Sequence, residues 1–260
     1  MTSIPIEPKN QETLFICYGK LNPKSIVGYN YVILESSFYT AVEIQEFKEK
    51  NETVFAYLSL GEVNKYSTIY DRLATSFIGK NENWDSFLLN LDLEITTTIL
   101  AESIDEYIKL GYHGIFFDNL DNFGIHGKQT AQKNSLLAFI KNMKSQYPNH
   151  LFIQNAGLEF IDFTYPLVDA VLVESVASHF DFSTSTYQLR SEEEFKVRLD
   201  TLDMIHNQYE IPVLLVEYAN SQERYNCIQD RLEPSEIPYF VGTIDLQTKP
   251  NFNPIPSYAF

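Results

Sequence analysis

Eight short segments rich in β-branched and aromatic residues recur along the chain, and most are separated by segments with helical periodicity. The expected strands are Thr13 to Tyr18, Tyr31 to Glu35, Val54 to Gly61, Gly114 to Asp118, Leu151 to Asn155, Ala170 to Glu174, Val213 to Tyr218 and Tyr239 to Ile244. The expected helices are Ala41 to Lys50, Ile95 to Leu110, Lys128 to Gln146, Glu192 to Gln208 and Gln222 to Arg231. Eight strands alternating with helices over 260 residues predict an α/β fold, a (β/α)8 TIM barrel that forms a single domain over residues 1–260.

The ends of the expected helices support this alternation. Ser191 precedes three glutamates as a helix cap, and Gly111 follows Lys109 where a helix should end. An open, doubly wound sheet is the alternative, but no Gly-x-Gly-x-x-Gly motif follows the first strand, so a dinucleotide-binding fold lacks its fingerprint.

One long segment interrupts the alternation. Residues Asn64 to Asp92 are polar in patches and include the only tryptophan, Trp84. We interpret them as an extended loop after the third strand, which in a barrel lies on the catalytic face. Tyr66, Phe77 and Trp84 could line a cleft there or pack against the barrel. At the end of the chain, residues 247–260 contain three prolines and predict a strap over the surface.

The charge of the chain restricts its partners. There are 35 acidic and 19 basic residues, for a net charge of −16 and a sequence pI near 4.6. Such a surface repels polyanions, so we expect neither nucleic acid nor an anionic membrane as a partner. A cationic or neutral substrate fits this charge, although the charge can also serve solubility alone.

The cysteines and the N-terminus bear on the compartment. Cys17 and Cys227 cannot form a disulfide scaffold, and we expect both to be free thiols. Residues 1–8 contain no basic segment followed by an apolar core. The chain as given should therefore carry no export signal, which fits a cytoplasmic protein or a secreted one whose leader has been removed.

Acids and amides lie where the expected strands end. In a barrel these ends meet at one mouth, and the chemistry is located there. The strand-end residues are Glu35, Glu62, Asp118, Asp121, Gln154, Asn155, Glu174, Glu217 and Asp245. Each has a structural alternative: Glu62 could pair with Lys65, for example, and Glu217 with Arg224. Together, however, a ring of like charges is costly unless it binds something or shares protons.

Several chemistries lack their usual residues. The five histidines show no paired ligand spacing, so we expect no metal, although an all-carboxylate site for magnesium or calcium stays open. No Gly-x-Ser-x-Gly motif occurs, and we expect no cofactor. Paired carboxylates remain, and glycoside hydrolysis needs such a pair. Asp118 and Glu174, two strands apart, should face each other across the mouth.

Four segments resemble the glycoside hydrolase family 114 proteins, also called the endo-α-1,4-polygalactosaminidase or spherulin-4-like family. They are Ala56 to Glu62, Gly111 to Phe123, Gln154 to Ala156 and Val216 to Tyr218. Asn83-Trp84 and Leu91-Asp92 also resemble positions of the family. The similarity spans roughly residues 13–245, and the Asp-Asn-x-Asp segment that begins at Asp118 is its most specific part. The chain departs from the family pattern at His113 and at Ser175, where many members have acids.

The resemblance implies a (β/α)8 barrel that hydrolyses α-1,4-linked galactosamine polymers with two acids. It implies Asp118 as nucleophile and Glu174 as general acid/base, or the reverse. The residues implied to bind substrate or to tune these acids are Tyr57, Glu62, Trp84, Asp121, Asn155, Glu217 and Tyr218. The expected partner is an oligo- or polysaccharide. Two alternatives stay open: a non-catalytic carbohydrate-binding barrel, and a metal-dependent lyase or aldolase.

Overall fold

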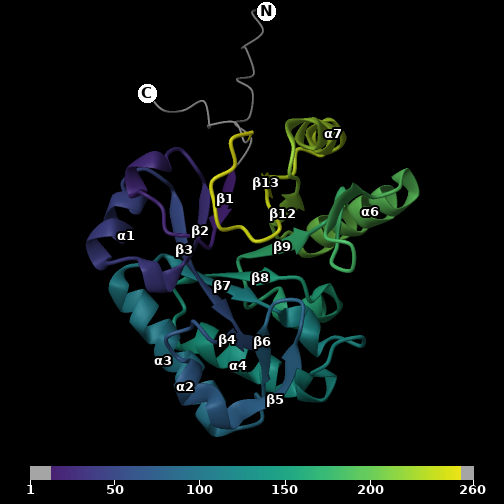
Figure 1. Cartoon of the computed structure of the whole chain (residues 1–260). Helices are drawn as coiled ribbons and strands as arrows, with labels where there is room; N and C mark the ends of the chain where they lie inside the picture. The colour runs from purple at the N-terminus through teal and green to yellow at the C-terminus, as the bar shows by residue number, and fades with distance from the viewer. Residues whose placement is uncertain (1–12, 253–260) are drawn as a thin grey trace, which may run out of the picture.

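Eight parallel strands form a nearly closed barrel in the order β1-β2-β3-β7-β8-β9-β12-β13 (Figure 1). The computed structural model describes residues 13–252. The barrel strands are β1 (Leu14–Cys17), β2 (Tyr31–Glu35), β3 (Thr53–Ser59), β7 (Gly114–Asp118), β8 (Leu151–Asn155), β9 (Ala170–Glu174), β12 (Val213–Tyr218) and β13 (Tyr239–Gly242). The first and last strands approach each other where the Phe15 and Phe240 rings lie 5.3 Å apart, and just beyond these strands Tyr18 N donates to Leu246 O. The predicted TIM barrel is therefore confirmed.

Helices surround the barrel, with α1 and α3 on one side and α6 and α7 on the other (Figure 1). Their bounds are α1 (Ala41–Lys48), α3 (Glu94–Leu110), α4 (Lys133–Gln146), α5 (Ile161–Thr164), α6 (Glu192–Tyr209) and α7 (Gln222–Leu232). The caps explain several of these ends. Thr40 and Ser191 each form a capping box, and Gly111 ends α3 with φ of 104°. No helix among residues 13–252 is long and apolar enough to cross a membrane.

Burial of both faces explains why the barrel strands could be predicted from the sequence. Because helices cover a parallel sheet, its strands are almost wholly apolar. Fully buried aromatic rings occur on both faces of the strands: Phe116 lies 6.1 Å from Tyr57 on the face that carries Asp118, and Phe117 and Phe152 lie 5.0 Å apart on the other face. Five expected strands agree with the observed bounds; they are β2, β7, β8, β9 and β12. The helix expected from Lys128 begins only at Lys133, because Thr130–Gln132 forms a separate 3₁₀ turn.

The segment expected to be a loop after the third strand contains a second sheet. It is antiparallel, with β4 (Glu62–Asn64), β6 (Ser86–Leu89) and β5 (Phe77–Asn81) in that order, and α2 (Tyr70–Leu73) lies between β4 and β5. A second insertion, the hairpin of β10 (Ser178–Asp181) and β11 (Thr186–Leu189), follows β9. Both insertions follow the carboxyl ends of barrel strands and therefore belong to the catalytic face.

The C-terminal strap is described in part. Lys249 Nζ donates to Ser25 O, and the Phe252 ring lies 5.2 Å from that of Tyr225. The rest of the predicted strap, residues 253–260, lies outside the described residues, as do residues 1–12 on which the expectation about an export signal rests.

Candidate active site

The last residues of β7, β8 and β9 are Asp118, Asn155 and Glu174. Asn155 Nδ2 donates to Asp118 Oδ1 at 2.6 Å and to Glu174 Oε1 at 2.7 Å. These two carboxylate oxygens therefore cannot lie farther apart than the sum of the two contacts, about 5.3 Å. The strand between the acids thus supplies the group that holds them together.

The residue after each of these three has a left-handed backbone. Asn119 has φ of 63°, Ala156 of 55° and Ser175 of 59°. Side chains other than glycine seldom adopt this conformation, and such strain persists only where the surroundings hold it. Here Ala156 N donates to Leu172 O and Ser175 N to Val216 O, both at 2.9 Å. The turns end the strands abruptly and leave the last side chain of each strand at the mouth.

Tyrosine hydroxyls donate hydrogen bonds to the carboxylate oxygens of Asp118 and Glu174 that Asn155 does not contact. Tyr57 OH, from β3, donates to Asp118 Oδ2 at 2.8 Å. Tyr218 OH, at the end of β12, donates to Glu174 Oε2. Desolvation raises the pKa of both tyrosines well above 10, so both remain donors across the working pH range.

The two acids differ in their affinity for a proton. Burial, and then the nearby charge of Asp118, raises the pKa of Glu174 to about 7, although the hydrogen bonds from Tyr218 and Asn155 oppose the shift. Burial also raises the pKa of Asp118 above its usual value, against hydrogen bonds from Asn155, Tyr57 and the Asn119 backbone. With a pKa of about 7, Glu174 holds a proton in about half of the molecules at neutral pH.

Glu62 lies apart from this pair and is 6% exposed. Its carboxylate accepts hydrogen bonds from Asn81 Nδ2, from Ser86 Oγ and from Asn122 Nδ2. It thereby joins the inserted sheet to the loop after β7. The considered ion pair with Lys65 is replaced, because Lys65 Nζ contacts Asp85 at 3.1 Å.

Glu217 is fully buried beside β9 and is also occupied by protein groups. Its oxygens accept from the backbone N–H of Val176 at 2.8 Å, of Ala177 at 2.9 Å and of Ser178 at 2.7 Å. Arg224, its considered ion-pair partner, instead donates to Asn220 at 2.9 Å. Glu217 therefore faces a loop rather than the mouth.

Asp121 and Trp84 lie on the accessible side of the site. Asp121 follows β7 in a short 3₁₀ turn and is exposed; local desolvation and then the charge of Asp118 raise its pKa. Trp84 lies in the turn between β5 and β6, is 47% exposed, and its ring contacts that of Phe182 at 5.1 Å. Of the other aromatics in that insertion, Tyr66 is exposed, whereas Phe77 stacks on Phe87 at 4.7 Å.

Two residues near the mouth were missed by the sequence analysis. Tyr18 follows β1, and its ring lies 4.5 Å from that of Tyr57. The charges of Asp118 and Glu174 both contribute, after burial, to the raised pKa of Tyr18. The rule that strand ends carry function could have found Tyr18, had it been applied to phenols as well as to acids and amides. Phe182 lies in the turn of the β10–β11 hairpin, which had no expected strands.

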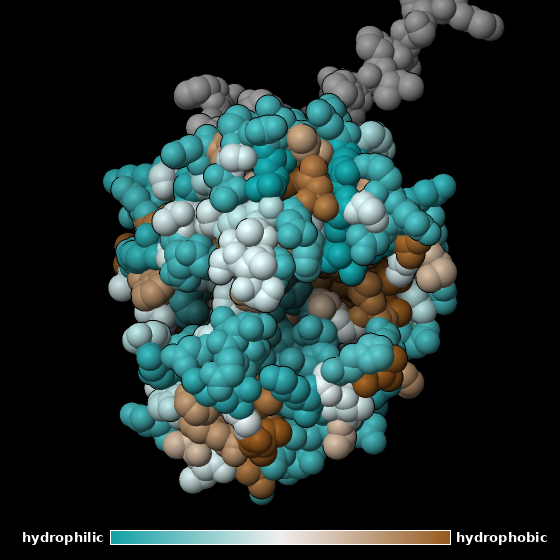
Figure 2. Space-filling model, turned by 45° about the vertical axis from the view of Figure 1, so that its right-hand side comes forward, coloured by the Kyte–Doolittle hydropathy of each residue, from teal (hydrophilic) through white to brown (hydrophobic). Residues whose placement is uncertain are grey.

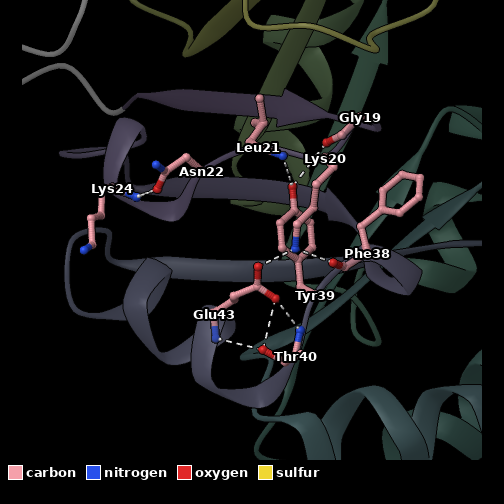
Figure 3. A network of polar contacts seen from close by, with 9 residues as sticks. All are labelled: Gly19, Lys20, Leu21, Asn22, Lys24, Phe38, Tyr39, Thr40 and Glu43. Atoms are coloured by element: carbon pink, nitrogen blue, oxygen red, sulfur yellow. Dashed lines mark hydrogen bonds and ion pairs between the residues drawn. The ribbon is translucent and has the colours of Figure 1, made fainter.

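The rim beside Tyr18 is fixed by the contacts in Figure 3. Tyr39 OH donates to Gly19 O at 3.2 Å and accepts from Leu21 N at 3.0 Å. Lys20 Nζ lies 4.3 Å from the centre of the Tyr39 ring and pairs with Glu43. The loop after β1 is thereby attached to the start of α1.

The carboxyl ends of β7, β8 and β9 point to the right of Figure 1. Figure 2 brings that side forward and shows a hollow across its middle, bordered mainly by hydrophilic residues with hydrophobic ones toward one end. Within residues 13–252, no three His, Cys, Asp or Glu side chains are placed to hold one metal ion.

Solved structures of glycoside hydrolases share this architecture. The glycoside hydrolase domain of PelA from Pseudomonas aeruginosa is 24% identical with a TM-score of 0.80, over 91% of this chain and 96% of that chain. Ega3 from Aspergillus fumigatus, solved in complex with galactosamine, is 15% identical with a TM-score of 0.73, over 95% of this chain and 96% of that chain. The α-galactosidase TtGalA from Thermus thermophilus is 10% identical with a TM-score of 0.57, over 89% of this chain and 58% of that chain. At these identities the likeness shows the fold.

No curated protein matches the chain by sequence. The model of glycoside-hydrolase family GH114, in contrast, matches residues 5–249. That match includes all barrel strands and both acids held by Asn155. This protein is therefore a glycosidase that belongs to glycoside-hydrolase family GH114.

Proposed function

We propose that the protein hydrolyses an α-linked polysaccharide of the galactosamine type, with Asp118 as nucleophile and Glu174 as general acid/base. One observation carries the proposal: the Asn155 amide holds both carboxyl groups, with oxygens no more than about 5.3 Å apart. Retaining glycosidases place their carboxyl groups about 5 to 5.5 Å apart, whereas inverting enzymes need about 6.5 to 9.5 Å to admit a water. The spacing favours retention.

In the first step Asp118 attacks the anomeric carbon as the glycosidic bond breaks. Glu174 gives its proton to the departing oxygen, so the leaving sugar departs as an alcohol and Asp118 forms a glycosyl ester. The raised pKa of Glu174, about 7, supplies a protonated acid at neutral pH. Tyr218 OH then stabilises the carboxylate that proton transfer leaves behind.

In the second step Glu174, now ionised, takes a proton from water. The resulting hydroxide attacks the anomeric carbon, the bond to Asp118 breaks, and the proton remains on Glu174 for the next cycle. Tyr57 and Asn155 donate to the Asp118 carboxylate that is released. Two inversions at one carbon give net retention.

The charge of the mouth supports an amino sugar. A galactosamine unit without its acetyl group carries an ammonium at neutral pH. The net charge of −16 and the exposed carboxylate of Asp121 near Asp118 attract such a cation. Ega3, with the same fold, was solved with galactosamine bound. Trp84 offers an exposed ring against which a sugar face can pack.

The test uses partially deacetylated α-1,4-galactosamine oligomers and an aryl α-galactosaminide, whose phenolate leaves without a proton. Wild-type protein should cleave both, with retention seen by NMR of the first-formed anomer. Asp118→Asn should lose about 10³-fold or more in kcat on both substrates. Glu174→Gln should lose a similar factor on oligomers but release a burst of phenolate from the aryl glycoside, because only the hydrolysis of the ester then lacks its base.

Four outcomes would contradict the proposal. Inversion would remove Asp118 as a covalent nucleophile. A burst in Asp118→Asn rather than in Glu174→Gln would exchange the two roles. Cleavage that a chelator abolishes would favour metal-assisted chemistry, and binding without cleavage would indicate that the polymer is not the substrate.

A further inference from the structure

Glu217 is a buried carboxylate to which the two-acid mechanism assigns no role. It lies on β12, one residue before Tyr218, and it is 0% exposed. In the sheet, Val216 of β12 pairs with Glu174 of β9. Isolated buried carboxylates are costly, and they persist where several donors compensate them. We therefore consider how the hydrogen bonds of Glu217 affect Glu174 on the adjacent strand.

Its donors come from the segment that directly follows the acid/base. Three successive N–H groups, of Val176, Ala177 and Ser178, point at the Glu217 carboxylate, and Ser178 Oγ also donates to it. Consecutive backbone N–H groups in a turn form a concave anion site. In this protein the anion is a side chain of the adjacent strand.

The contacts form a closed circuit that returns to Glu174. From Glu174 the chain passes through the left-handed Ser175 to Ser178, whose Oγ also accepts the N–H of Tyr218 at 2.9 Å. Tyr218 OH then donates to Glu174 Oε2. Glu217 therefore holds the turn that follows Glu174, and through Ser178 it also holds the backbone of Tyr218, the phenol donor to Glu174.

The opposite edge of this segment is held by other groups. Arg190 Nε donates to Ser175 O at 2.7 Å, and Arg190 N donates to Ala177 O at 3.0 Å. These bonds satisfy carbonyls only. Without the Glu217 carboxylate the three N–H groups would lose their acceptor, and the turn would keep only two bonds to β12, from Ser175 N to Val216 O and from Tyr218 N to Ser178 Oγ.

We propose that Glu217 is a positioning residue for the acid/base: it fixes residues 175–178 and Tyr218 so that the Glu174 carboxyl stays on the Asn155 amide. This role rests on the proposed two-acid function. Glu217 itself touches neither substrate nor the reacting atoms. A displacement of a catalytic group by about 1 Å can cost about 10²-fold in rate, which sets the scale of the expected effect.

The test compares Glu217→Gln with Asn51→Ala. A glutamine keeps the size of the side chain, but its single oxygen cannot accept all four bonds, and its NH₂ meets N–H donors. Asn51 is a matched control because it is 8% exposed and bonds the backbone of Ile26, Tyr29 and Phe47, before β3 and away from the mouth. Ser178→Ala, which removes one hydroxyl, is a milder variant in case Glu217→Gln does not fold.

On galactosamine oligomers, Glu217→Gln should lower kcat by about 10- to 100-fold with KM within about 3-fold. The basic limb of its pH profile should move to lower pH, because burial is the largest cause of the raised pKa of Glu174, and water that enters a loosened turn outweighs a weaker Tyr218 bond. Hydrogen exchange of residues 175–178 should accelerate. Ser178→Ala should change the same three readouts in the same direction by less, whereas Asn51→Ala should lower only the melting temperature.

A folded Glu217→Gln with the kcat and pH profile of the wild type would overturn the proposal and leave Glu217 a purely structural group. Unchanged exchange at residues 175–178 would overturn the circuit itself, whatever the activity. Full activity of Glu174→Gln on oligomers would instead overturn the two-acid function, and with it the catalytic part of this role. The exchange readout does not depend on catalysis, so these failures are distinguishable.

Discussion

Two pairs of acids lie at or just after the carboxyl ends of barrel strands, and their different surroundings fit the different roles that we propose for them. Asp118 and Glu174 share one amide donor, and each receives one phenol. Glu62 and Glu217 are each enclosed by three or four donors from other segments. Asp118 and Glu174 lie at the barrel mouth and differ in their affinity for a proton. Glu62 and Glu217 join loops to the barrel.

The number of donors around each carboxyl separates the acids that we propose to be reactive from those that we propose to be structural. Hydrogen bonds from several N–H groups favour the ionised form of a carboxylate, and they oppose the effect of burial, which still raises the pKa of Glu217. A reactive pair instead needs one member that still binds a proton near neutral pH. Burial with few donors achieves this in Glu174, and its cost should be measurable as lost stability.

The largest effect that tests this contrast is on the stability of the protein. The pKa of Glu174 is about 7 when the protein is folded and near the usual 4.5 when it is unfolded, so folding favours the protonated form. The stability contributed by this group is complete below the unfolded pKa and is lost as pH rises through about 7. Relative to wild type, Glu174→Gln should therefore gain up to about 3 kcal/mol in the free energy of unfolding between pH 5 and pH 8.

Urea unfolding at several pH values measures this difference. Glu193→Gln is the control, because Glu193 is exposed in the first turn of α6. If the free energies of unfolding of Glu174→Gln and wild type differ by a constant amount from pH 5 to pH 8, folding does not raise the pKa of Glu174. The proposed contrast with Glu217 would then be wrong.

Much of this arrangement could be read from the sequence, and the remainder depended on distant partners. The apolar runs that end in Asp118, Asn155 and Glu174 gave the barrel and its mouth, because only buried parallel strands need both faces apolar. Glu62 and Glu217 follow similar runs and were grouped with the site. The donors of Glu62 lie 19, 24 and 60 residues away in sequence, and the nearest donor of Glu217 lies 39 residues away, so only the fold brings them together.

The insertions were missed for a different reason. The strands of the second sheet are short and partly exposed, so their sequence lacks the continuous apolar signal of the barrel strands. The β10–β11 hairpin has the same property, with exposed residues in and around its turn. Their positions over the mouth could be anticipated from the barrel rule, but their structure could not.

The next effect sharpens the comparison from the structural side. Glu62→Gln should lower the free energy of unfolding by about 1 to 3 kcal/mol, because a buried, charge-assisted set of hydrogen bonds is lost. Its kcat should stay within a few-fold of wild type. Thermal unfolding and oligomer cleavage measure the two effects, with Glu82→Gln as control for an exposed ion pair. A tenfold loss of kcat at unchanged stability would place Glu62 in the chemistry instead.

A smaller effect distinguishes the two phenols. The Tyr218 hydrogen bond lowers the pKa of Glu174, so Tyr218→Phe should move the basic limb of the pH profile upward by about 0.5 to 1 unit. The Tyr57 bond lowers the pKa of Asp118, so Tyr57→Phe should move the acidic limb upward instead. Plots of kcat/KM against pH test both, and Tyr66→Phe, an exposed phenol, is the control. Movement of the same limb by both variants would refute the separate roles of the two acids.

The smallest expected effect concerns the contact between the two insertions. The Trp84 and Phe182 rings meet at 80° with centres 5.1 Å apart, although both side chains are partly exposed. Such ring pairs contribute about 0.5 to 1.5 kcal/mol, so a double-mutant cycle with Trp84→Ala and Phe182→Ala should show a coupling of this size in stability. If the two insertions together border the path of a polysaccharide, either variant should also raise KM for long oligomers by a few-fold and leave the aryl glycoside unaffected. An equal rise for both substrates would place the ring contact at the reacting sugar, and no coupling would mean that the two insertions act independently.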